Sequence, residues 1–272
     1  MLQYQELLPL SPRLLPYIES YFTISGAGKI PTKYIMPRPG TALTIDFTGK
    51  YYNGDNFLKM ALCGPHEQPY LISSHTSQTD CIVIKFTSFG LSRFINIPLN
   101  TLVNQVVDAT DIFDKEMTTL FSRLEDHSSP IQRIRLLENY LLQRLNEPVN
   151  TDISIFRMAG QIALQQENLS IPTLLEDIPL SIRQTERRFK QLIGTDLQTY
   201  LRVCRFNAAK KLLLHSTSRR LTDIAYNAQY YDQAHFSNEF KRLSGIRPGK
   251  YDACGESRHA APHTKDVVLI QF

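Results

Sequence analysis

A repeated segment in the last third of the chain constrains its fold more than any other feature. Residues 189–200 are FKQLIGTDLQTY and residues 240–251 are FKRLSGIRPGKY, so both fit F-K-x-L-x-G-x5-Y at a spacing of 51 residues. Ser181 and Asp232 have the same spacing, and both are favoured N-cap residues before a helical pattern. Glycine commonly follows the end of a helix, so the sequence predicts two copies of one unit: a short helix, a tight turn and a second helix. Residues 199–216 are predicted to form one longer helix between the copies.

The second helix of each copy has an apolar face and an opposite polar face, at about 100° per residue. The side chains predicted to face the core are Phe236, Phe240 and Leu243 in the second copy and Thr185, Phe189 and Leu192 in the first. The outward side chains are Arg183, Gln184, Arg187 and Gln191 in the first copy and Ala234, His235, Asn238 and Arg242 in the second. In a major groove arginine can contact guanine, and asparagine or glutamine can contact adenine. A solvated helix face more often mixes Glu with Lys, so the composition favours contact with DNA bases.

The net charge of +4 is unevenly distributed. Residues 1–150 hold 13 Lys and Arg against 14 Asp and Glu, whereas residues 151–255 hold 15 against 10. A basic second part is typical of a domain that binds a polyanion. Helix N-termini and four lysines are predicted to contact phosphates there: Lys190, Lys210, Lys211 and Lys241.

This arrangement resembles the AraC/XylS family of bacterial transcription regulators. The family's second unit typically has the sequence I-A-x-x-x-G-F-x-(D/S)-x-S-x-F-x-R-x-F-K-x-x-x-G-x-x-P-x-x-Y. The counterparts here are Ile224-Ala225, Asp232, Phe236, Phe240-Lys241, Gly245, Pro248 and Tyr251. The resemblance spans about residues 165–252 and implies two helix-turn-helix subdomains, each inserting a recognition helix into the major groove. By position it implies base contacts from Arg183, Glu186 and Arg187 in the first copy and from Gln233, Ala234, His235 and Asn238 in the second.

The chain departs from the family pattern in both turns. Gln229 stands where the family has glycine, and Tyr230 follows it in place of phenylalanine. If this position needs a positive φ, Gln229 costs about 1 kcal/mol, and otherwise the turn differs. In the first copy Pro179 replaces a common glycine and Leu175 replaces a small residue, while Asn238 replaces a frequent arginine in the second.

The first 150 residues change from a strand pattern to a helical one. Residues 43–47 and 80–86 alternate apolar and polar side chains, as strands with one buried face do. A helical period begins near residue 115, Ser129-Pro130 is a plausible helix start, and Glu147 to Asp152 is predicted to be a linker. We therefore predict an α+β protein. Its parts are a β-rich cupin-like barrel or sandwich with helices (1–147), an all-α DNA-binding domain (153–254) and a tail (255–272) that either adds a strand or frays.

By resemblance, the N-terminal domain is expected to be a sensory or dimerising domain. Residues 11–22, 37–47 and 62–65 are similar to those of a less characterised branch of the family. The polar candidates for binding a small effector are Arg38, Asp46 and Lys85, for which solvated strand-face positions are the favoured alternative. His66 and His75 are too far apart for an H-x-H cluster, so they are interpreted as surface or turn residues, with no metal and no cofactor expected. Residues 116–147 have an apolar face that includes Leu137 and Leu141. This face is expected to pack either on the sheet of its own domain or against a second subunit in a homodimer.

The leading prediction is a DNA-binding transcription regulator, and RNA polymerase is a partner if it activates. The alternatives are a DNA-modifying or repair enzyme with the same DNA-binding module, and a scaffold that has lost DNA binding. Scattered cysteines (Cys63, Cys81, Cys204 and Cys254) argue against a zinc site and favour structural roles and a reducing cytoplasm. No apolar run reaches the ~18 residues of a membrane span, and the N-terminus does not resemble a secretory signal.

Overall fold

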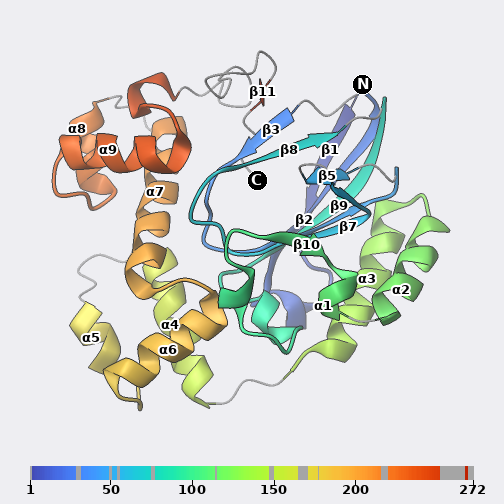
Figure 1. The fold of residues 1–272 in the computed structure, drawn as a ribbon, viewed down its shortest axis with the longest axis horizontal. Helices are drawn as coiled ribbons and strands as arrows, with labels where there is room; N and C mark the ends of the chain where they lie inside the picture. The colour runs from blue at the N-terminus through green and yellow to red at the C-terminus, as the bar shows by residue number, and fades with distance from the viewer. Residues whose placement is uncertain are drawn as a thin grey trace.

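The chain has a β-rich N-terminal domain and an all-helical C-terminal domain, which confirms the predicted α+β class (Figure 1). The computed structural model describes residues 2–28, 32–48, 51–53, 56–74, 77–113, 115–146, 150–164, 171–176, 178–215, 220–251 and 267–268.

The larger sheet of the N-terminal domain has six strands in the order β1-β2-β9-β4-β7-β10. All its neighbouring strands pair antiparallel. Their bounds are β1 Leu2–Leu7, β2 Ile18–Ala27, β4 Ala42–Asp46, β7 Met60–Cys63, β9 Gln78–Phe86 and β10 Val106–Asp108. Both strands predicted from alternation, at 43–47 and 80–86, are therefore present as β4 and β9.

The smaller sheet has the order β11-β3-β8-β5-β6 and lies beside the larger one (Figure 1). Its strands are β3 Thr32–Ile35, β5 Tyr51–Asn53, β6 Asn56–Leu58, β8 Tyr70–Ser74 and β11 Val267–Val268. The short β11 pairs parallel with β3. This part of the tail therefore adds a strand, which was one of the two alternatives predicted for it. The rest of the tail from residue 252 lies outside the described residues, and so does Cys254.

The prediction of one buried face is wrong for β9. Both faces of this strand are buried. One face carries Ile82 and Ile84, and the other carries Cys81, Val83 and Lys85. The reason is that this strand is central in the larger sheet, with helices over one face and the smaller sheet beside the other (Figure 1). Polar side chains on the second face must therefore find partners inside the protein.

Three helices cover one face of the larger sheet: α1 Thr110–Phe113, α2 Lys115–Glu125 and α3 Pro130–Arg144. Helix α3 begins after Ser129, at the predicted Pro130. Leu137 and Leu141 are buried in the same core cluster as Ile45 and Ile84. The apolar face of α3 therefore packs on its own sheet. Short 3-10 helices complete the domain at Pro12–Leu14, Leu91–Arg93 and Leu99–Leu102.

The C-terminal domain consists of six α-helices among the described residues, followed by a 3-10 turn at Pro248–Lys250. They are α4 Asn150–Ala163, α5 Ile171–Glu176, α6 Ile182–Ile193, α7 Leu197–His215, α8 Leu221–Asn227 and α9 Gln233–Ser244. Helix α4 begins inside the predicted linker, so the prediction is wrong for residues 150–152. Asp152 lies in the first turn of α4, where a carboxylate is favourable, and its buried oxygens accept hydrogen bonds from Arg188 at 2.8 Å.

Helix α7 joins two separate hydrophobic clusters. One contains Phe189, Tyr200 and Cys204 with residues of α4, and the other contains Phe206, Phe236 and Phe240. Each copy of the repeat therefore has a core of its own, which confirms two subdomains joined by a central helix. The N-terminal domain contributes to both clusters, since Met36 packs in the second and Phe89 against the first.

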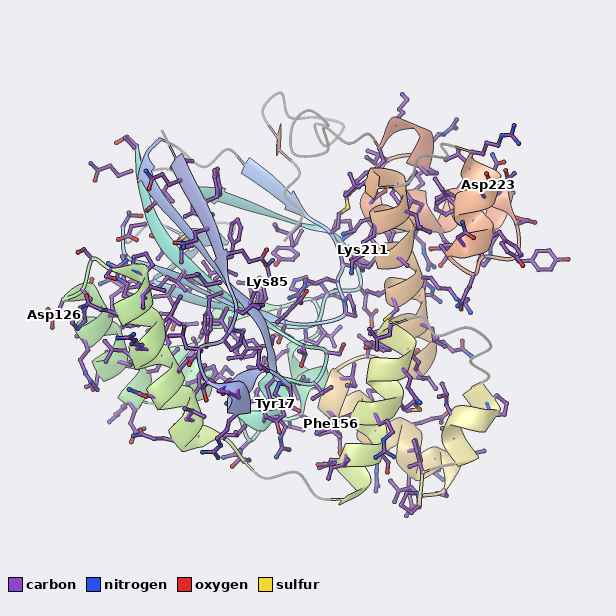
Figure 2. The ribbon with its side chains drawn as sticks, turned by 180° about the vertical axis from the view of Figure 1, so that it is seen from behind. Tyr17, Lys85, Asp126, Phe156, Lys211 and Asp223 are labelled. Carbon is purple, nitrogen blue, oxygen red and sulfur yellow. The ribbon has the colours of Figure 1, made fainter. Side chains whose placement is uncertain are left out.

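Specific contacts hold the two domains together. The rings of Phe89 and Phe156 stack with centroids 4.2 Å apart, and Figure 2 shows Phe156 at the boundary between the domains. The hydroxyl oxygens of Ser88 and Tyr200 are 2.6 Å apart, and Tyr200 donates to the carbonyl of Ala159 at 3.0 Å. Burial raises the Tyr200 pKa, and the hydrogen bond with Ser88 opposes this increase. None of the described helices is both long and apolar enough to cross a membrane.

Candidate nucleic-acid interface

Helix α6, the second helix of the first copy, begins at a capping box. The Ser181 hydroxyl accepts a hydrogen bond from the Gln184 backbone N–H at 3.3 Å, and the Gln184 side-chain oxygen accepts from the Ser181 N–H at 3.0 Å. The helix ends at Gly194, whose φ is 99°. Gln184 was predicted to contact a base, but its amide oxygen is already bound in the cap.

The two faces of α6 are those that the periodicity predicts. Thr185, Phe189 and Leu192 are buried. The exposed side chains are Arg183, Gln184, Glu186, Arg187 and Lys190, with Gln191 partly exposed. Arg188 differs from its arginine neighbours because it points back to Asp152 on α4 and stabilises the subdomain.

The exposed face of α6 lines a groove of about 960 Å³. Arg183, Arg187 and Lys190 line it from α6, Leu175 lines it from α5, and the start of α7 closes it at Leu197. The groove also holds the carboxylates of Glu186 and Asp196. The Asp196 carboxylate accepts a hydrogen bond from the Thr199 backbone N–H at 2.8 Å, so it caps α7.

Helix α9 is the corresponding helix of the second copy. Asp232 caps it by accepting a hydrogen bond from the His235 backbone N–H at 2.7 Å, and Gly245 ends it in the left-handed region. The base-contact candidates Gln233, Ala234, His235 and Asn238 are all exposed on one side of the helix. The predicted core face of Phe236, Phe240 and Leu243 is buried.

The turn before α9 shows whether the position of Gln229 needs a positive φ. Its φ is 60°, so the position is left-handed and a glutamine occupies a conformation suited to glycine. Tyr230 follows and is buried against Phe236, with ring centroids 5.2 Å apart. The turn therefore keeps the left-handed geometry at a cost of about 1 kcal/mol.

Arg242 is on the polar side of α9, but it forms an ion pair with a carboxylate of the same helix. Its guanidinium lies 2.8 Å from Glu239, and Glu239 also lies 3.3 Å from Arg202 on α7. The ion pairs hold α9 on the central helix. Arg242 would have to leave Glu239 in order to contact a base.

The lysines predicted to contact phosphates divide into two groups. Lys190, Lys211 and Lys241 are exposed. Lys210 is only 5% exposed, so its prediction as a phosphate contact is wrong. It lies on the buried side of α7, near the cationic Arg38 and Lys211, and desolvation lowers its pKa to about 7.

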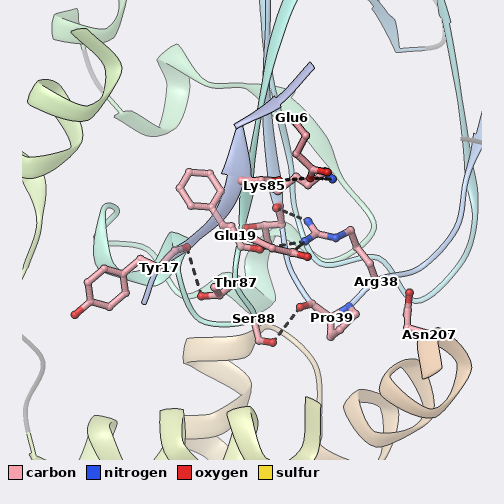
Figure 3. Close-up of polar contacts among 12 residues, drawn as sticks. Glu6, Tyr17, Glu19, Arg38, Pro39, Lys85, Thr87, Ser88 and Asn207 are labelled. Carbon is pink, nitrogen blue, oxygen red and sulfur yellow. Dashed lines mark hydrogen bonds and ion pairs between the residues drawn. The ribbon is translucent and has the colours of Figure 1, made fainter. Parts of the chain in front are cut away.

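The three effector candidates do not form one site. Figure 3 shows two neighbouring acid–base pairs: Lys85 donates to Glu6 at 2.8 Å, and Arg38 binds Glu19. Hydrogen bonds from Lys85 and from Ser20 lower the Glu6 pKa. Asp46 lies at the end of β4, where it accepts hydrogen bonds from Thr48. Lys85 and Asp46 are buried, so the alternative prediction of solvated strand-face positions is wrong for both.

The histidine and cysteine predictions have mixed outcomes. His66 is buried in the loop after β7, where a ring nitrogen lies 2.7 Å from the Gly64 carbonyl, so it is not a surface residue. His75 lies outside the described residues. Cys63, Cys81 and Cys204 are buried thiols, as structural cysteines are. Within the described ranges no three His, Cys, Asp or Glu side chains are grouped to hold a metal ion.

Sequence reasoning missed the contacts between domains. Phe89, Ser88 and Asn207 lie far from their partners in the chain, so periodicity gave no signal for them. Asn207 donates to the Pro37 carbonyl at 3.0 Å, 170 residues away. Only the apolar character of Phe89 could have indicated that it is partly buried.

Comparisons with known proteins agree with this geometry. Residues 174–253 match a family model described as a helix-turn-helix domain, which covers both copies of the repeat. Residues 5–108 match one described as a domain of unknown function (DUF6597).

Two curated relatives match part of the chain. The HTH-type transcriptional activator RhaS of Enterobacter sp. (strain 638) is 40% identical over 76 residues, 28% of this chain and 27% of the relative. The arabinose operon regulatory protein of Escherichia coli (strain K12) is 28% identical over 142 residues, 49% of this chain and 48% of the relative. The chain thus spans half or less of the length of these relatives.

Solved structures resemble the chain more distantly. ToxT from Vibrio cholerae matches with a TM-score of 0.42 and 11% identity, covering 92% of this chain and 97% of that one. The C-terminal domain of AraT from Geobacillus stearothermophilus has a TM-score of 0.35 and 26% identity, covering 43% and 95%.

The two capped helices on separate cores, with the helix-turn-helix match over both, define a double helix-turn-helix protein. Together with the RhaS and arabinose regulator matches, they confirm the family that the repeat predicted. Residues 174–253 of the chain thus form a helix-turn-helix region of the AraC/XylS type.

Proposed function

We propose that the protein is a transcription regulator that binds specific duplex DNA through α6 and α9. One observation carries the proposal: two capped helices, on separate hydrophobic cores, expose faces made largely of Arg, Gln, Asn and His. The regulators among its relatives support it. No feature of the described residues favours the DNA-modifying enzyme over this function.

Helix α7 supports insertion into successive major grooves. It has 19 residues and is therefore about 28 Å long, which is close to the ~34 Å that separates major grooves on one side of a duplex. Arg183 and Arg187 would contact guanine, while Gln233 and Asn238 would contact adenine. His235, Ala234, Glu186 and Gln191 border these positions, and Lys190, Lys211 and Lys241 would bind phosphates.

Selection of bound duplexes from a random pool tests the proposal. We expect the wild-type protein to enrich two sequence blocks about 10 bp apart, with Arg187→Ala relaxing one block and Asn238→Ala the other. Lys241→Ala should weaken all sequences alike and lower the slope of log affinity against log salt by about 1. Weak binding that is insensitive to salt and sequence would instead indicate a scaffold without DNA binding.

Regulation through the N-terminal domain is part of the proposal. The buried Lys85 with the exposed Glu6, and the partly buried Arg38 with the exposed Glu19, supply charged groups that a small effector could engage. Asp46 lies four residues further along β4 than the residue that pairs with Lys85, so it does not join them directly. Homodimer formation and contact with RNA polymerase are proposed from family membership alone. Since Leu137 and Leu141 are buried, a dimer would use other residues, and light scattering would measure its size.

A further inference from the structure

Two tyrosines on either side of the turn between α8 and α9 are almost fully exposed. Tyr226 on α8 is 81% exposed, and Tyr231, immediately before the cap residue Asp232, is 92% exposed. They are the most exposed large apolar side chains among the described residues. Tyr230 between them is only 6% exposed and packs in the core of the subdomain.

The fold does not explain this exposure. Within the described part of the chain, the second hydrophobic cluster is formed by Ile224, Tyr230 and their neighbours, and it includes neither Tyr226 nor Tyr231. Two aromatic rings in water, close to one another along the chain, are unusual unless a partner covers them.

The repeat indicates where Tyr226 lies relative to the recognition face. The residue 51 positions earlier is Leu175, which lines the same groove as Arg183, Arg187 and Lys190. By the equivalence of the two copies, Tyr226 stands beside the face of α9 that carries Asn238 and Lys241. Its side chain is longer than leucine and ends in a hydroxyl group.

The counterpart of Tyr231 has a different role. It is Leu180, which is partly buried against the core of the first subdomain. In the second subdomain Tyr230 fills the core instead, so Tyr231 is left at the N-terminal end of α9. In helix-turn-helix proteins this end of the second helix enters the groove, while the first helix crosses the DNA backbone.

We propose that Tyr226 and Tyr231 position the second recognition helix by donating phenol hydrogen bonds to phosphate oxygens that border the groove entered by α9. The inference rests on the proposed function. Tyrosine hydroxyls are regular phosphate donors in protein–DNA complexes. Because the phenol is neutral, these contacts release no counterion, unlike those of Lys241.

The difference between a neutral and a charged contact supplies the test. The duplex selected by the wild-type protein would be titrated with wild type, Tyr226→Phe and Tyr231→Phe at several salt concentrations. We expect each phenylalanine variant to bind about tenfold more weakly with an unchanged salt slope, since a hydrogen bond to a charged group is lost while the ring remains. Tyr4→Phe, on the half-exposed Tyr4 of β1, is the matched control and should bind as wild type does.

Each other outcome has a distinct meaning. Phenylalanine variants that bind as tightly as wild type, beside a Lys241→Ala variant that binds weakly, would overturn the tyrosine contacts and leave the proposed function standing. The same holds if only Tyr226→Ala and Tyr231→Ala weaken binding, since the ring and not the hydroxyl would then touch DNA. Failure of the wild-type protein to select any duplex would overturn the proposed function itself.

Discussion

Lys210 is a single residue whose burial affects the stability of the whole chain. Its pKa falls from an ordinary 10.5 to about 7 because the ammonium is desolvated and lies near Arg38 and Lys211. Between these two pH values the unfolded chain binds more protons than the folded one, so the free energy of unfolding rises with pH. Below about pH 7 both states are protonated and the cost of burying the charge is fully present.

Replacement of Lys210 by methionine should therefore stabilise the protein most at low pH. We expect Lys210→Met to unfold at higher urea concentration than wild type near pH 7, with a smaller difference near pH 10, where wild-type Lys210 is neutral when folded. Lys211→Met, at the exposed neighbour, should keep most of the wild-type dependence on pH, because desolvation is the main cause of the lowered Lys210 pKa. A constant difference between Lys210→Met and wild type across this range would contradict the assignment.

Arg188 and Arg187 are adjacent but should respond to mutation in opposite ways. Arg188→Ala leaves the buried carboxylate of Asp152 without its partner, and we expect a loss of about 3 kcal/mol in the free energy of unfolding. Arg187→Ala removes only an exposed side chain, so stability should change by less than about 0.5 kcal/mol while DNA binding falls. Equal stability of the two variants in urea unfolding would show that the Asp152–Arg188 pair does not hold α4 on α6.

At the scale of elements, the glycines that end α6 and α9 provide a matched comparison. Both have positive φ, 99° at Gly194 and 77° at Gly245. A Cβ on Gly194 would in addition lie 2.3 Å from Cγ of Pro65, in the N-terminal domain, whereas Gly245 is exposed. We expect Gly245→Ala to cost about 1 kcal/mol of stability and Gly194→Ala about 1–3 kcal/mol more, as measured by urea unfolding. Equal costs would mean that α6 does not rest on Pro65.

The same helices show which elements could be predicted from sequence. Their caps, polar faces and glycine ends follow from local chemistry, and the 51-residue repeat confirms each element with a second copy. Residues 150–152 could not be assigned correctly, because Asp152 is helical partly through its bond to Arg188, 36 residues later. Alternation also failed for β9, since the burial of its second face depends on a sheet built from other segments.

Candidate site residues were predictable only where exposure follows from helical period. The period alone separates Arg183 and Arg187 from Phe189. It could not show that Arg242 is bound by Glu239 or that Gln184 is used in a cap. Lys210 and Lys211 are adjacent and of the same type, and the packing around α7 shows that the first is buried and the second exposed.

At the scale of the whole molecule, the N-terminal domain packs on α4 and α7, the helices that contact α6 and α9. Met36 enters the second hydrophobic cluster, and Phe89 stacks on Phe156 beside the first. Asn207 and Tyr200 bind the same domain from α7. A change in the N-terminal domain can therefore alter the position of α7, which sets the distance between α6 and α9.

Coupling of this kind predicts how the protein unfolds. The shared contacts should make the two domains unfold together in one calorimetric transition. Phe89→Ala removes the stack on Phe156, and we expect the transition to broaden or divide, with a total loss of about 3 kcal/mol. Leu8→Ala, at an exposed apolar residue of the N-terminal domain, is the control and should leave a single transition. If Phe89→Ala unfolds in one sharp transition at the wild-type temperature, the stack on Phe156 does not contribute to the coupling of the two domains. Two separate transitions in the wild-type protein would show that the domains are stable independently.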